Sequence, residues 1–403
     1  MKKSFFYSLL LALALAPTVH AYGPDGHKII GAIADKKLAG TPAGARVTEL
    51  LDGYTLEEAS IIADTIKQWD KPGIDDPKVQ KYFSSHPKIA EQLREFWKAN
   101  PPTTDDKSPV PSHHWFHYTD VPLVGNANYA DGKVGRSQWD IVHMMRFCIA
   151  VLQGKEPEEN ARKITKPVAL ILLAHFVGDI HQPLHVGAQY FDAKGQPVDP
   201  ERGGEVFPDE GGNSLRLKLT RDFVPRKKDP KLHGFWDGDT VFANLPQFPD
   251  TMPKEERQAK MDGAEKELSD RLAKEEPKNW RLPSSLPVSD YPEAWANSIL
   301  PLARQVHERL RYQNVTPKLD HEKMVADGEV VEEPMKDGLS YSKWSARVVL
   351  QEMQLAGWRL ADLLEKVLGP NESSPTPATP ASSATPAPAA PIVTPNESPS
   401  PSP

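Results

Sequence analysis

One stretch of the chain, Leu170 to Val186 (LILLAHFVGDIHQPLHV), restricts the fold and the chemistry more than any other. Its first half is almost entirely apolar, which predicts a buried helix, and Pro183 ends that helix because proline lacks the N–H needed for continuation. His175 and Asp179 stand four residues apart, so both side chains leave the same helix face. A buried carboxylate beside imidazoles needs a compensating cation, and zinc suits nitrogen and oxygen ligands.

The first 21 residues, MKKSFFYSLLLALALAPTVHA, carry two lysines, an apolar run and a small-residue ending. This pattern is typical of a secretory signal peptide and is too short for a membrane span. We therefore expect cleavage after Ala21, a mature chain beginning at Tyr22, and a secreted or periplasmic protein. No later segment approaches the length of a membrane span, so none is predicted.

The composition limits which partners the protein can take. The formal net charge is -7, and loss of Lys2 and Lys3 with the signal peptide would bring it to -9, which argues against a broad basic surface for duplex DNA. The single cysteine, Cys148, lies in an apolar run and has no partner for an internal disulfide. Rigidity must therefore come from the core or from metal.

Long helical patterns of apolar residues predict an all-α fold, mainly α-helical, from residue 22 to 369, which is enough chain for one large domain or two fused ones. The expected helices cover residues 27–38, 45–51, 56–69, 137–153, 168–180, 291–312 and 342–367. The charged segment at about 250–280 is interpreted as a solvated helical excursion. Residues 370–403 are almost entirely Pro, Ser, Thr and Ala, which predicts a disordered tail.

Four further segments carry residue types that bind metal. They contain His27, Asp64, His117, and the pair His233 and Asp237, which repeats the four-residue spacing of His175 and Asp179. His185, in the turn after the predicted helix break, is another candidate ligand.

Each of these candidates has a structural alternative. Asp64 could cap a helix or pair with Lys67 one turn later, and His27 could simply open a helix. His113 and His114 compete with His117, although the polar SPVPS loop before them suggests that they lie at the surface.

The order of the motifs resembles a known family. YG-x3-H, AD-x2-K, HY-x-D, H-x3-D-x-HQPLH, GGN and LH-x2-WD follow one another as in the zinc-dependent, single-strand-specific nucleases of the S-one/P-one type. The resemblance covers Tyr22 to about Gly369, and its six motifs in one order are specific. It implies the mainly helical phospholipase C/P-one nuclease-like fold with a three-zinc cleft.

Carried over by position, the resemblance implies three zinc ions per chain. The ligands of the first would be Asp64, His117, His175 and Asp179, and those of the second His185, His233 and Asp237. The third would take the amino nitrogen and carbonyl oxygen of Tyr22, together with His27 and the second oxygen of Asp179.

The chain departs from the fungal members of that family in three places. Tyr22 replaces an N-terminal tryptophan, which is harmless if only backbone atoms bind the metal. The fungal disulfides are absent, because Cys148 is alone. Gly238 stands where some members use a side chain to bind the base, so base recognition does not transfer.

The resemblance also implies the chemistry. Zinc lowers the pKa of bound water towards about 7 and neutralises phosphate charge, and the products would carry a 5′-phosphate. Lys67 would steady the developing phosphate charge, Asp120 would orient the attacking water, and Tyr118 would stack on a base of an unpaired strand unless it is plain core packing. Three zincs against three aspartates leave about +3 to attract single-stranded nucleic acid locally.

Two other functions stay open at this point. A zinc-dependent phospholipase C has a similar architecture, but its last ligand pair ends in Glu where this chain has Asp237. A non-catalytic zinc-binding protein would need neither Lys67 nor Asp120 beside the metal. No obligate protein partner is indicated, and we expect a monomer whose additional 3′-nucleotidase activity is open.

Overall fold

The structure, a computed structural model, describes residues 22–70, 73, 75–82, 84, 86–101, 112–219, 230–249, 251–320 and 323–370. The signal-peptide prediction for residues 1–21 and, beyond Pro370, the tail prediction fall outside these residues. The helices are α1 (Gly23–Leu38), α2 (Pro42–Leu50), α3 (Leu56–Ala59), α4 (Ile62–Lys67), α5 (Pro77–Tyr82), α6 (Pro87–Ala99), α7 (Ile141–Leu152), α8 (Lys166–Asp179), α9 (Leu232–Gly234), α10 (Thr240–Phe242), α11 (Lys254–Lys274), α12 (Tyr291–Glu308) and α13 (Tyr341–Leu368). Short 3-10 turns are η1 (Gln68–Asp70), η2 (His113–His117), η3 (Pro183–His185), η4 (Pro200–Arg202) and η6 (Val288–Asp290), and η5 (Phe235–Asp239) is a π-helical turn.

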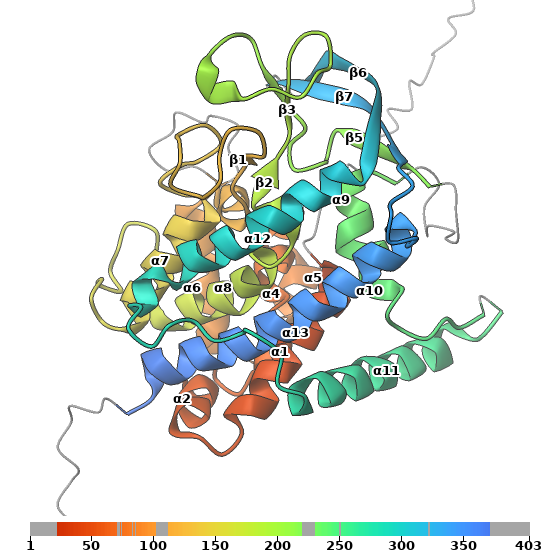
Figure 1. Cartoon of the computed structure of the whole chain (residues 1–403). Helices are drawn as coiled ribbons and strands as arrows, with labels where there is room; N and C mark the ends of the chain where they lie inside the picture. The colour runs from red at the N-terminus through yellow and green to blue at the C-terminus, as the bar shows by residue number, and fades with distance from the viewer. Residues whose placement is uncertain are drawn as a thin grey trace, which may run out of the picture. The chain divides into compact units, whose positions relative to one another are not determined.

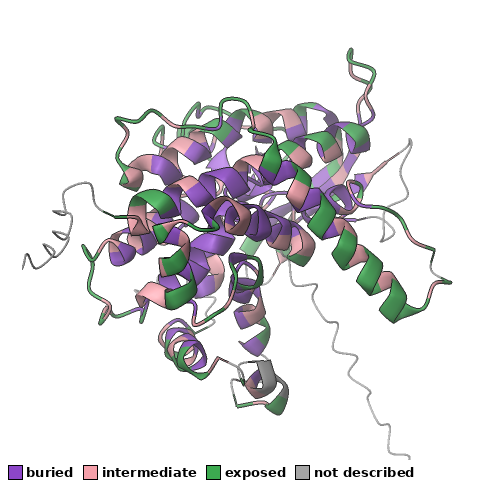
Figure 2. Ribbon diagram, turned by 90° about the horizontal axis from the view of Figure 1, so that it is seen from below, coloured by how far each residue is buried: buried purple, intermediate pink, exposed green. Residues whose placement is uncertain are grey.

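Helix α8 lies at the centre of the described structure, and every residue from Val168 to Asp179 is buried. A helix that is apolar all round has no solvent face, so it needs partners on every side. Helices α1, α2, α3, α4, α6, α7 and α13 supply them (Figure 1). The buried residues gather in this interior and the exposed ones on the outer helix faces (Figure 2).

Helices α1 and α13 pack closely beside α8. A Cβ atom at Gly357 would lie only 2.6 Å from the Ile33 side chain, so a larger residue there would push the two helices apart. Because α1 begins directly after Tyr22, the packing of α1 on α13 also holds Tyr22 in position.

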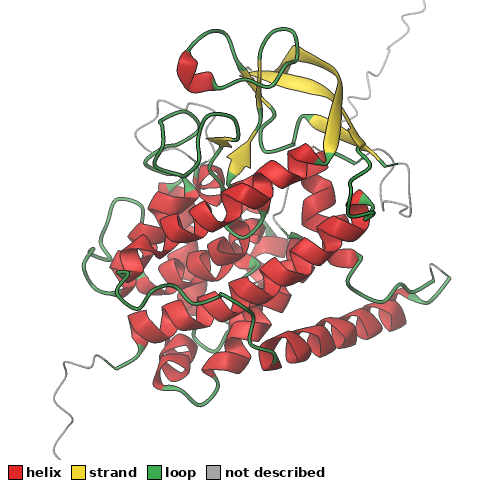
Figure 3. Cartoon of the chain, in the orientation of Figure 1, coloured by secondary structure: helices red, strands yellow, loops and turns green. Residues whose placement is uncertain are grey.

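The strands gather at one end of the helical body (Figure 3). Three strands form a sheet in the order β5-β7-β6, in which β6 and β7 are an antiparallel hairpin and β5 runs parallel to β7. Two smaller pairs are β1 with β2, which is parallel, and β3 with β4, which is antiparallel. The bounds are β1 (Val121–Pro122), β2 (Gly187–Ala188), β3 (Tyr190–Phe191), β4 (Phe207–Pro208), β5 (Leu215–Lys218), β6 (Leu310–Asp320) and β7 (Lys323–Glu332).

The mainly α-helical prediction is confirmed, and most predicted helices differ from the observed ones by a few residues at their ends, but two differ in kind. The segment expected to be one helix from 56 to 69 is split at Ser60 and Ile61 into α3 and α4. The segment expected to be helical from 291 to 312 ends at Glu308 and continues as strand β6. A register shift between Gln313 and Thr316 breaks the alternation that would have indicated a strand.

The charged segment forms helix α11, most of whose residues are exposed, but one face of its second half packs on the core. Leu268 and Leu272 are buried, and α11 packs against α1 and α13. The Leu272 carbonyl also accepts a hydrogen bond from Trp358 Nε1 at 3.0 Å. None of the described helices is long and apolar enough to cross a membrane.

Candidate metal centre

Helix α8 and the turn after it carry the first candidate ligands. His175 and Asp179 lie one turn apart, with His175 Nε2 at 3.2 Å from Asp179 Oδ2. The chain then turns through η3, where Gln182 Oε1 accepts a hydrogen bond from the Leu184 N–H at 2.6 Å and fixes the turn that carries His185. The end of α8 and the following turn therefore hold His175, Asp179 and His185 in fixed relative positions.

Two other segments bring Asp64 and His117 to the same place. His117 Nδ1 lies 2.9 Å from Asp179 Oδ2, and His175 Nε2 lies 3.6 Å from Asp64 Oδ1. His117 Nδ1 is 4.0 Å from the same Asp64 oxygen. Two ligands about 2.1 Å from one tetrahedral ion lie about 3.4 Å apart, so these four side chains fit around a single zinc.

A second group joins the turn after α8 to helix α9 and turn η5. His233 Nε2 is 3.2 Å from Asp237 Oδ2, and His185 Nε2 is 3.9 Å from Asp237 Oδ1. All three side chains are buried and lie at a spacing that a zinc ion could bridge, so they form a second set of candidate ligands. The strand pair β1 and β2 supports this group, because the Thr119 N–H donates to the His185 carbonyl at 2.9 Å beside it.

The third group lies where α1 meets α8. His27 Nε2 is 3.3 Å from Asp179 Oδ1, whereas the other Asp179 oxygen faces His117 and His175. Gly178 makes this approach possible, since a Cβ there would lie 2.7 Å from His27 Nδ1. The two oxygens of Asp179 thus point to different sets of imidazoles, as a carboxylate that bridges two ions would require.

Tyr22 is fully buried beside this third group. Its hydroxyl donates to the His181 carbonyl at 2.6 Å, and its own carbonyl accepts the Gly26 N–H at 3.1 Å. A carbonyl oxygen has two lone pairs, so this bond leaves one for a metal. That the Tyr22 backbone binds a third ion stays a prediction.

Backbone carbonyls orient three of the histidines. The Nδ1 atoms of His175, His185 and His233 lie 2.6, 2.8 and 2.7 Å from the carbonyls of Ser60, His117 and Gly211. Each Nδ1–H therefore donates to a carbonyl, and each Nε2 is left with its lone pair aimed into the centre. Those three Nε2 atoms are buried and have no hydrogen-bond partner among the described residues. A bound metal ion would satisfy them, since buried polar atoms normally have a partner.

The electrostatics favour the metal-binding forms of His27, His233 and Asp179, whereas the carboxylate form of Asp237 needs a cation to be stable. Burial lowers the pKa of His27 to about 4 and that of His233 to about 3, so both imidazoles are neutral at pH 7. Burial alone would raise the pKa of Asp179, but the charge of His175 and its hydrogen bonds to the imidazoles hold it well below its usual range. Burial raises the pKa of Asp237 well above its usual range, so an ionised carboxylate there calls for a cation.

Of the three side chains predicted to act on the substrate, Lys67 has a direct contact with a candidate ligand. Lys67 Nζ lies 2.9 Å from Asp64 Oδ1 and so stands directly beside the first ligand group. Asp120 is half-buried, and burial, followed by the charge of Glu210, raises its pKa to about 7. Tyr118 is also half-buried, and its stacking role stays a prediction.

Sequence reasoning missed the groups that hold the ligands in place. Gln182 Nε2 donates to Asp237 Oδ1 at 2.8 Å, and this amide could have been suspected because it is polar within a buried turn. The carbonyls of Ser60 and Gly211 carry no signal in the sequence, since every residue has one. The expectation that His113 lies at the surface is wrong, because that side chain is buried.

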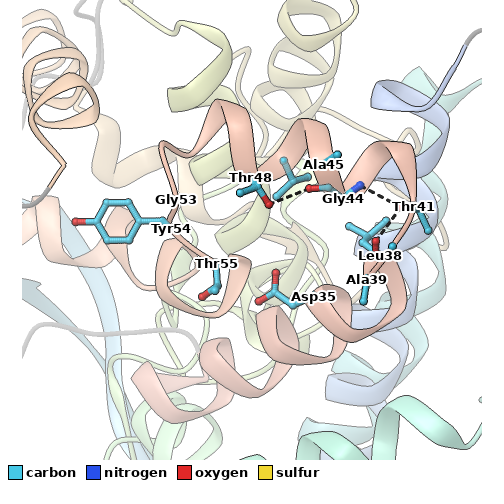
Figure 4. Close-up of a pocket in the computed structure, with 12 residues that line it drawn as sticks. Asp35, Leu38, Ala39, Thr41, Gly44, Ala45, Thr48, Gly53, Tyr54 and Thr55 are labelled. Atoms are coloured by element: carbon cyan, nitrogen blue, oxygen red, sulfur yellow. Dashed lines mark hydrogen bonds between the residues drawn. The ribbon is translucent and has the colours of Figure 1, made fainter.

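The hollow drawn in Figure 4 is separate from the centre. It has a volume of about 450 Å³ and lies between α1, α2 and the loop before α3. Asp35 at its edge accepts the N–H groups of Leu56 and Glu57 at 2.9 and 3.0 Å and so caps α3. None of the residues that line it belongs to the three ligand groups.

Several groups of buried histidine and aspartate side chains that could hold metal ions therefore lie together on a mainly helical scaffold. The sequence profile of the S1/P1 Nuclease family matches residues 22–369, which includes every one of these ligands. The chain therefore belongs to the S1/P1 nuclease family.

Three curated proteins of Arabidopsis thaliana are similar to this chain. Endonuclease 2 is 25% identical over 238 residues, which cover 57% of this chain and 59% of that protein. Endonuclease 1 is 24% identical over 245 residues, 59% of each chain, and Endonuclease 4 is 25% identical over 149 residues, 34% of this chain and 42% of that protein. The matches thus span less than two thirds of the relatives' own length.

Proposed function

We propose that this protein is an exported, zinc-dependent phosphodiesterase that hydrolyses single-stranded RNA and DNA and leaves 5′-phosphates. Membership of the S1/P1 nuclease family and the names of the Arabidopsis endonucleases support nuclease chemistry. The observation that carries the proposal is the position of Asp179, whose two oxygens lie 3.3 Å from His27 Nε2 and 2.9 Å from His117 Nδ1. A carboxylate whose two oxygens face different imidazoles can bridge two metal ions, as in bimetallic hydrolytic sites.

The donor set fits zinc. It combines imidazole nitrogens with carboxylate oxygens, its polar atoms are buried, and its ligand separations cluster around the value for a tetrahedral ion. Zinc would be held by three sets of residues: Asp64, His117, His175 and Asp179; His185, His233 and Asp237; and Tyr22, His27 and Asp179. When bound, zinc supplies a water of lowered pKa and positive charge for the phosphate oxygens.

Lys67 adds a cation that is not a ligand. Its ammonium group contacts Asp64 Oδ1 at 2.9 Å, and the side chain keeps some exposure at the edge of the centre. From there it binds a phosphate oxygen and stabilises the negative charge that grows in the transition state. Its contact with Asp64 also holds that carboxylate in place.

Asp120 supplies a proton-accepting group. Its pKa of about 7 allows it to exchange a proton near neutral pH, which is the range in which a general base is most effective. Its backbone N–H donates to the Gly135 carbonyl at 2.8 Å and fixes the position of the loop. We assign to Asp120 the role of orienting the attacking water.

Tyr118 explains the preference for unpaired strands. It directly follows His117 in the chain and is only half-buried, so its ring can offer a face to a base. A base can stack on a protein ring only when it is not already stacked and paired in a duplex. Single-stranded substrates therefore fit this site best. Because the net charge of the chain is negative, the positive charge of the zinc ions must attract the nucleic acid locally.

The proposal is tested by hydrolysis assays on single-stranded RNA, single-stranded DNA, duplex DNA and phosphatidylcholine, with product ends identified by mass spectrometry. We expect cleavage of both single strands to 5′-phosphorylated fragments and much slower cleavage of the duplex. Release of phosphate from 3′-nucleotides is measured in the same series. Cleavage of phosphatidylcholine alone would support a phospholipase C instead, and full zinc content without any hydrolysis would support a metal-binding protein.

A further inference from the structure

A second cluster of ligand-type side chains lies outside the three groups of the metal centre. Asp70, in η1, faces His113 and His114, which open η2. Asp70 Oδ2 is 2.7 Å from His114 Nε2, and Asp70 Oδ1 is 4.0 Å from His113 Nε2. These separations lie on either side of the spacing of about 3.4 Å expected for two ligands on one tetrahedral zinc.

His113 is the part of the cluster that hydrogen bonding does not explain. The residue is 2% exposed, and its Nε2 atom has no hydrogen-bond partner among the described residues. At 4.0 Å the nearest Asp70 oxygen is beyond hydrogen-bonding distance. A buried ring nitrogen that faces a carboxylate without bonding to it is a group that a metal ion between them would satisfy.

The protonation states suit a metal as well. Burial lowers the pKa of His113 to about 4, so its imidazole is neutral at pH 7 and can donate a lone pair. Burial alone would raise the pKa of Asp70, but its contacts with His113, His114 and Trp97 hold it well below the usual range. Asp70 is therefore a carboxylate at neutral pH, and its charge opposes that of a cation.

The carboxylate keeps free acceptor positions. Trp97 Nε1 donates to Asp70 Oδ1 at 2.8 Å and fixes this oxygen in orientation. Each carboxylate oxygen has about two lone-pair positions, so one bond at Oδ1 leaves room for a metal there. His114 is 41% exposed in its side chain, which gives an ion a route from solvent and leaves space for water to complete the coordination.

The place of the cluster in the fold links it to the main centre. Asp70 follows Lys67 by three residues, and His113 precedes the ligand His117 by four, so the same two segments supply both clusters. An ion held between η1 and η2 would cross-link the segments that carry Asp64, Lys67 and His117. It would therefore stiffen one side of the main centre without contacting it.

We propose that Asp70, His113 and His114 bind a further divalent transition-metal ion, with Zn²⁺ as the ion that best fits two imidazoles and one carboxylate. The site differs from the main centre in its half-exposed ligand His114, so its ion exchanges more readily with solution. The proposal does not depend on the proposed function, because it concerns metal content and the stability of two segments. A protein without nuclease activity would still bind this ion.

The test is the zinc content of the wild type, His113→Gln and His114→Gln after dialysis of each full mature protein against the same buffered free Zn²⁺. We expect each variant to hold one ion fewer per chain than the wild type. Added Zn²⁺ should also raise the melting temperature of the wild type more than that of either variant, because binding to the native state stabilises it. Circular dichroism checks that the variants are folded, and His114→Gln, at a half-exposed position, keeps the test valid if His113→Gln does not fold.

The matched control is His143→Gln. His143 Nδ1 also contacts a carboxylate, Asp140 Oδ1, at 2.9 Å, and its side chain is 43% exposed, but it belongs to none of the groups that could hold a metal. This variant should keep the zinc content of the wild type. Equal zinc in all four proteins would overturn the proposal and leave Asp70 as the acceptor of ordinary hydrogen bonds from Trp97 and His114.

Discussion

Two carboxylates of this protein are almost completely removed from water, and their surroundings differ. Asp179 in the metal centre is 0% exposed, and Glu265 on α11, where that helix packs on α1, is 5% exposed. The imidazoles around Asp179 hold its pKa well below the usual range, although burial opposes them. At Glu265 burial and the charge of Asp25 win against Lys28 and raise the pKa to about 7.

The comparison shows that burial alone does not indicate a functional carboxylate. Asp179 contacts three imidazoles within 3.3 Å, whereas Glu265 Oε1 is buried without a hydrogen-bond partner among the described residues. Replacing a buried carboxylate that imidazoles surround should lower activity and stability strongly. Replacing one that is buried near another carboxylate should raise the free energy of unfolding.

Asp179→Asn should have the largest effect, because it removes the residue shared by two ligand groups. We expect activity on single-stranded RNA to fall by more than about 100-fold. Loss of a residue that only supports a metal ligand typically lowers activity less than this. Zinc content and melting temperature should fall as well, because metal binding contributes to folding.

The control for that variant is Asp35→Asn. Asp35 also accepts two hydrogen bonds, from the backbone of α3, but it belongs to none of the ligand groups. It should keep its zinc and its activity. Full zinc content and unchanged melting in Asp179→Asn would show that this carboxylate is not the bridge.

An extension at the mature amino terminus should have the next largest effect. If the Tyr22 nitrogen and carbonyl bind the third ion, one added glycine replaces the amine with an amide, which is a poor ligand. We expect a strong loss of activity and of one zinc, with the other groups still loaded. Activity and zinc content are compared for chains that begin at Tyr22 and chains that carry the extra glycine.

Side-chain changes at the same residue provide the contrast. Tyr22→Phe should lose only the hydrogen bond from the hydroxyl to the His181 carbonyl, worth about 1 kcal/mol, and keep its zinc. Equal turnover and equal zinc in the extended and the unextended chain would favour a two-zinc centre.

These expectations show what the sequence could predict and where it could not. His175, Asp179 and His185 were predictable because they lie within eleven residues of one buried helix and its terminal proline turn. The ligands on other segments, Asp64 and His117, became convincing only as part of an ordered set of motifs. Each alone had a local explanation as strong as metal binding.

The supporting contacts could not be predicted, for physical reasons. The Ser60 carbonyl accepts from His175 because the helix breaks there, and a sequence does not show which carbonyl a break leaves available. Strand β6 was hidden because its bulge removes the period of two that indicates a strand. The burial of His113 depends on segments brought together only by folding, so its polar neighbours in the sequence were misleading.

Lys67→Ala should have an intermediate effect, which separates charge stabilisation from ligation. We expect turnover to fall by about 100-fold, at the lower end for loss of one preorganised transition-state contact, while the zinc content stays unchanged. Lys98→Ala is the matched control, because Lys98 pairs with Glu95 at the same three-residue spacing but on an exposed helix face. Loss of zinc in Lys67→Ala alone would mean that Lys67 only positions Asp64.

Glu265→Gln should have the smallest effect and the opposite sign to Asp179→Asn. In the folded protein the Glu265 pKa is raised from 4.5 to about 7, so the wild type loses stability as the pH rises through that range, whereas glutamine does not titrate. The variant should therefore match the wild type near pH 4 and be more stable at pH 8, by up to about 3 kcal/mol, the free energy that corresponds to a pKa rise of this size. Chemical unfolding of both proteins at several pH values measures the difference, with the exposed Glu267→Gln on the same helix as control. A variant that is less stable at pH 8 would mean that the Glu265 carboxylate is compensated in the native protein, and the contrast with Asp179 would then be one of degree.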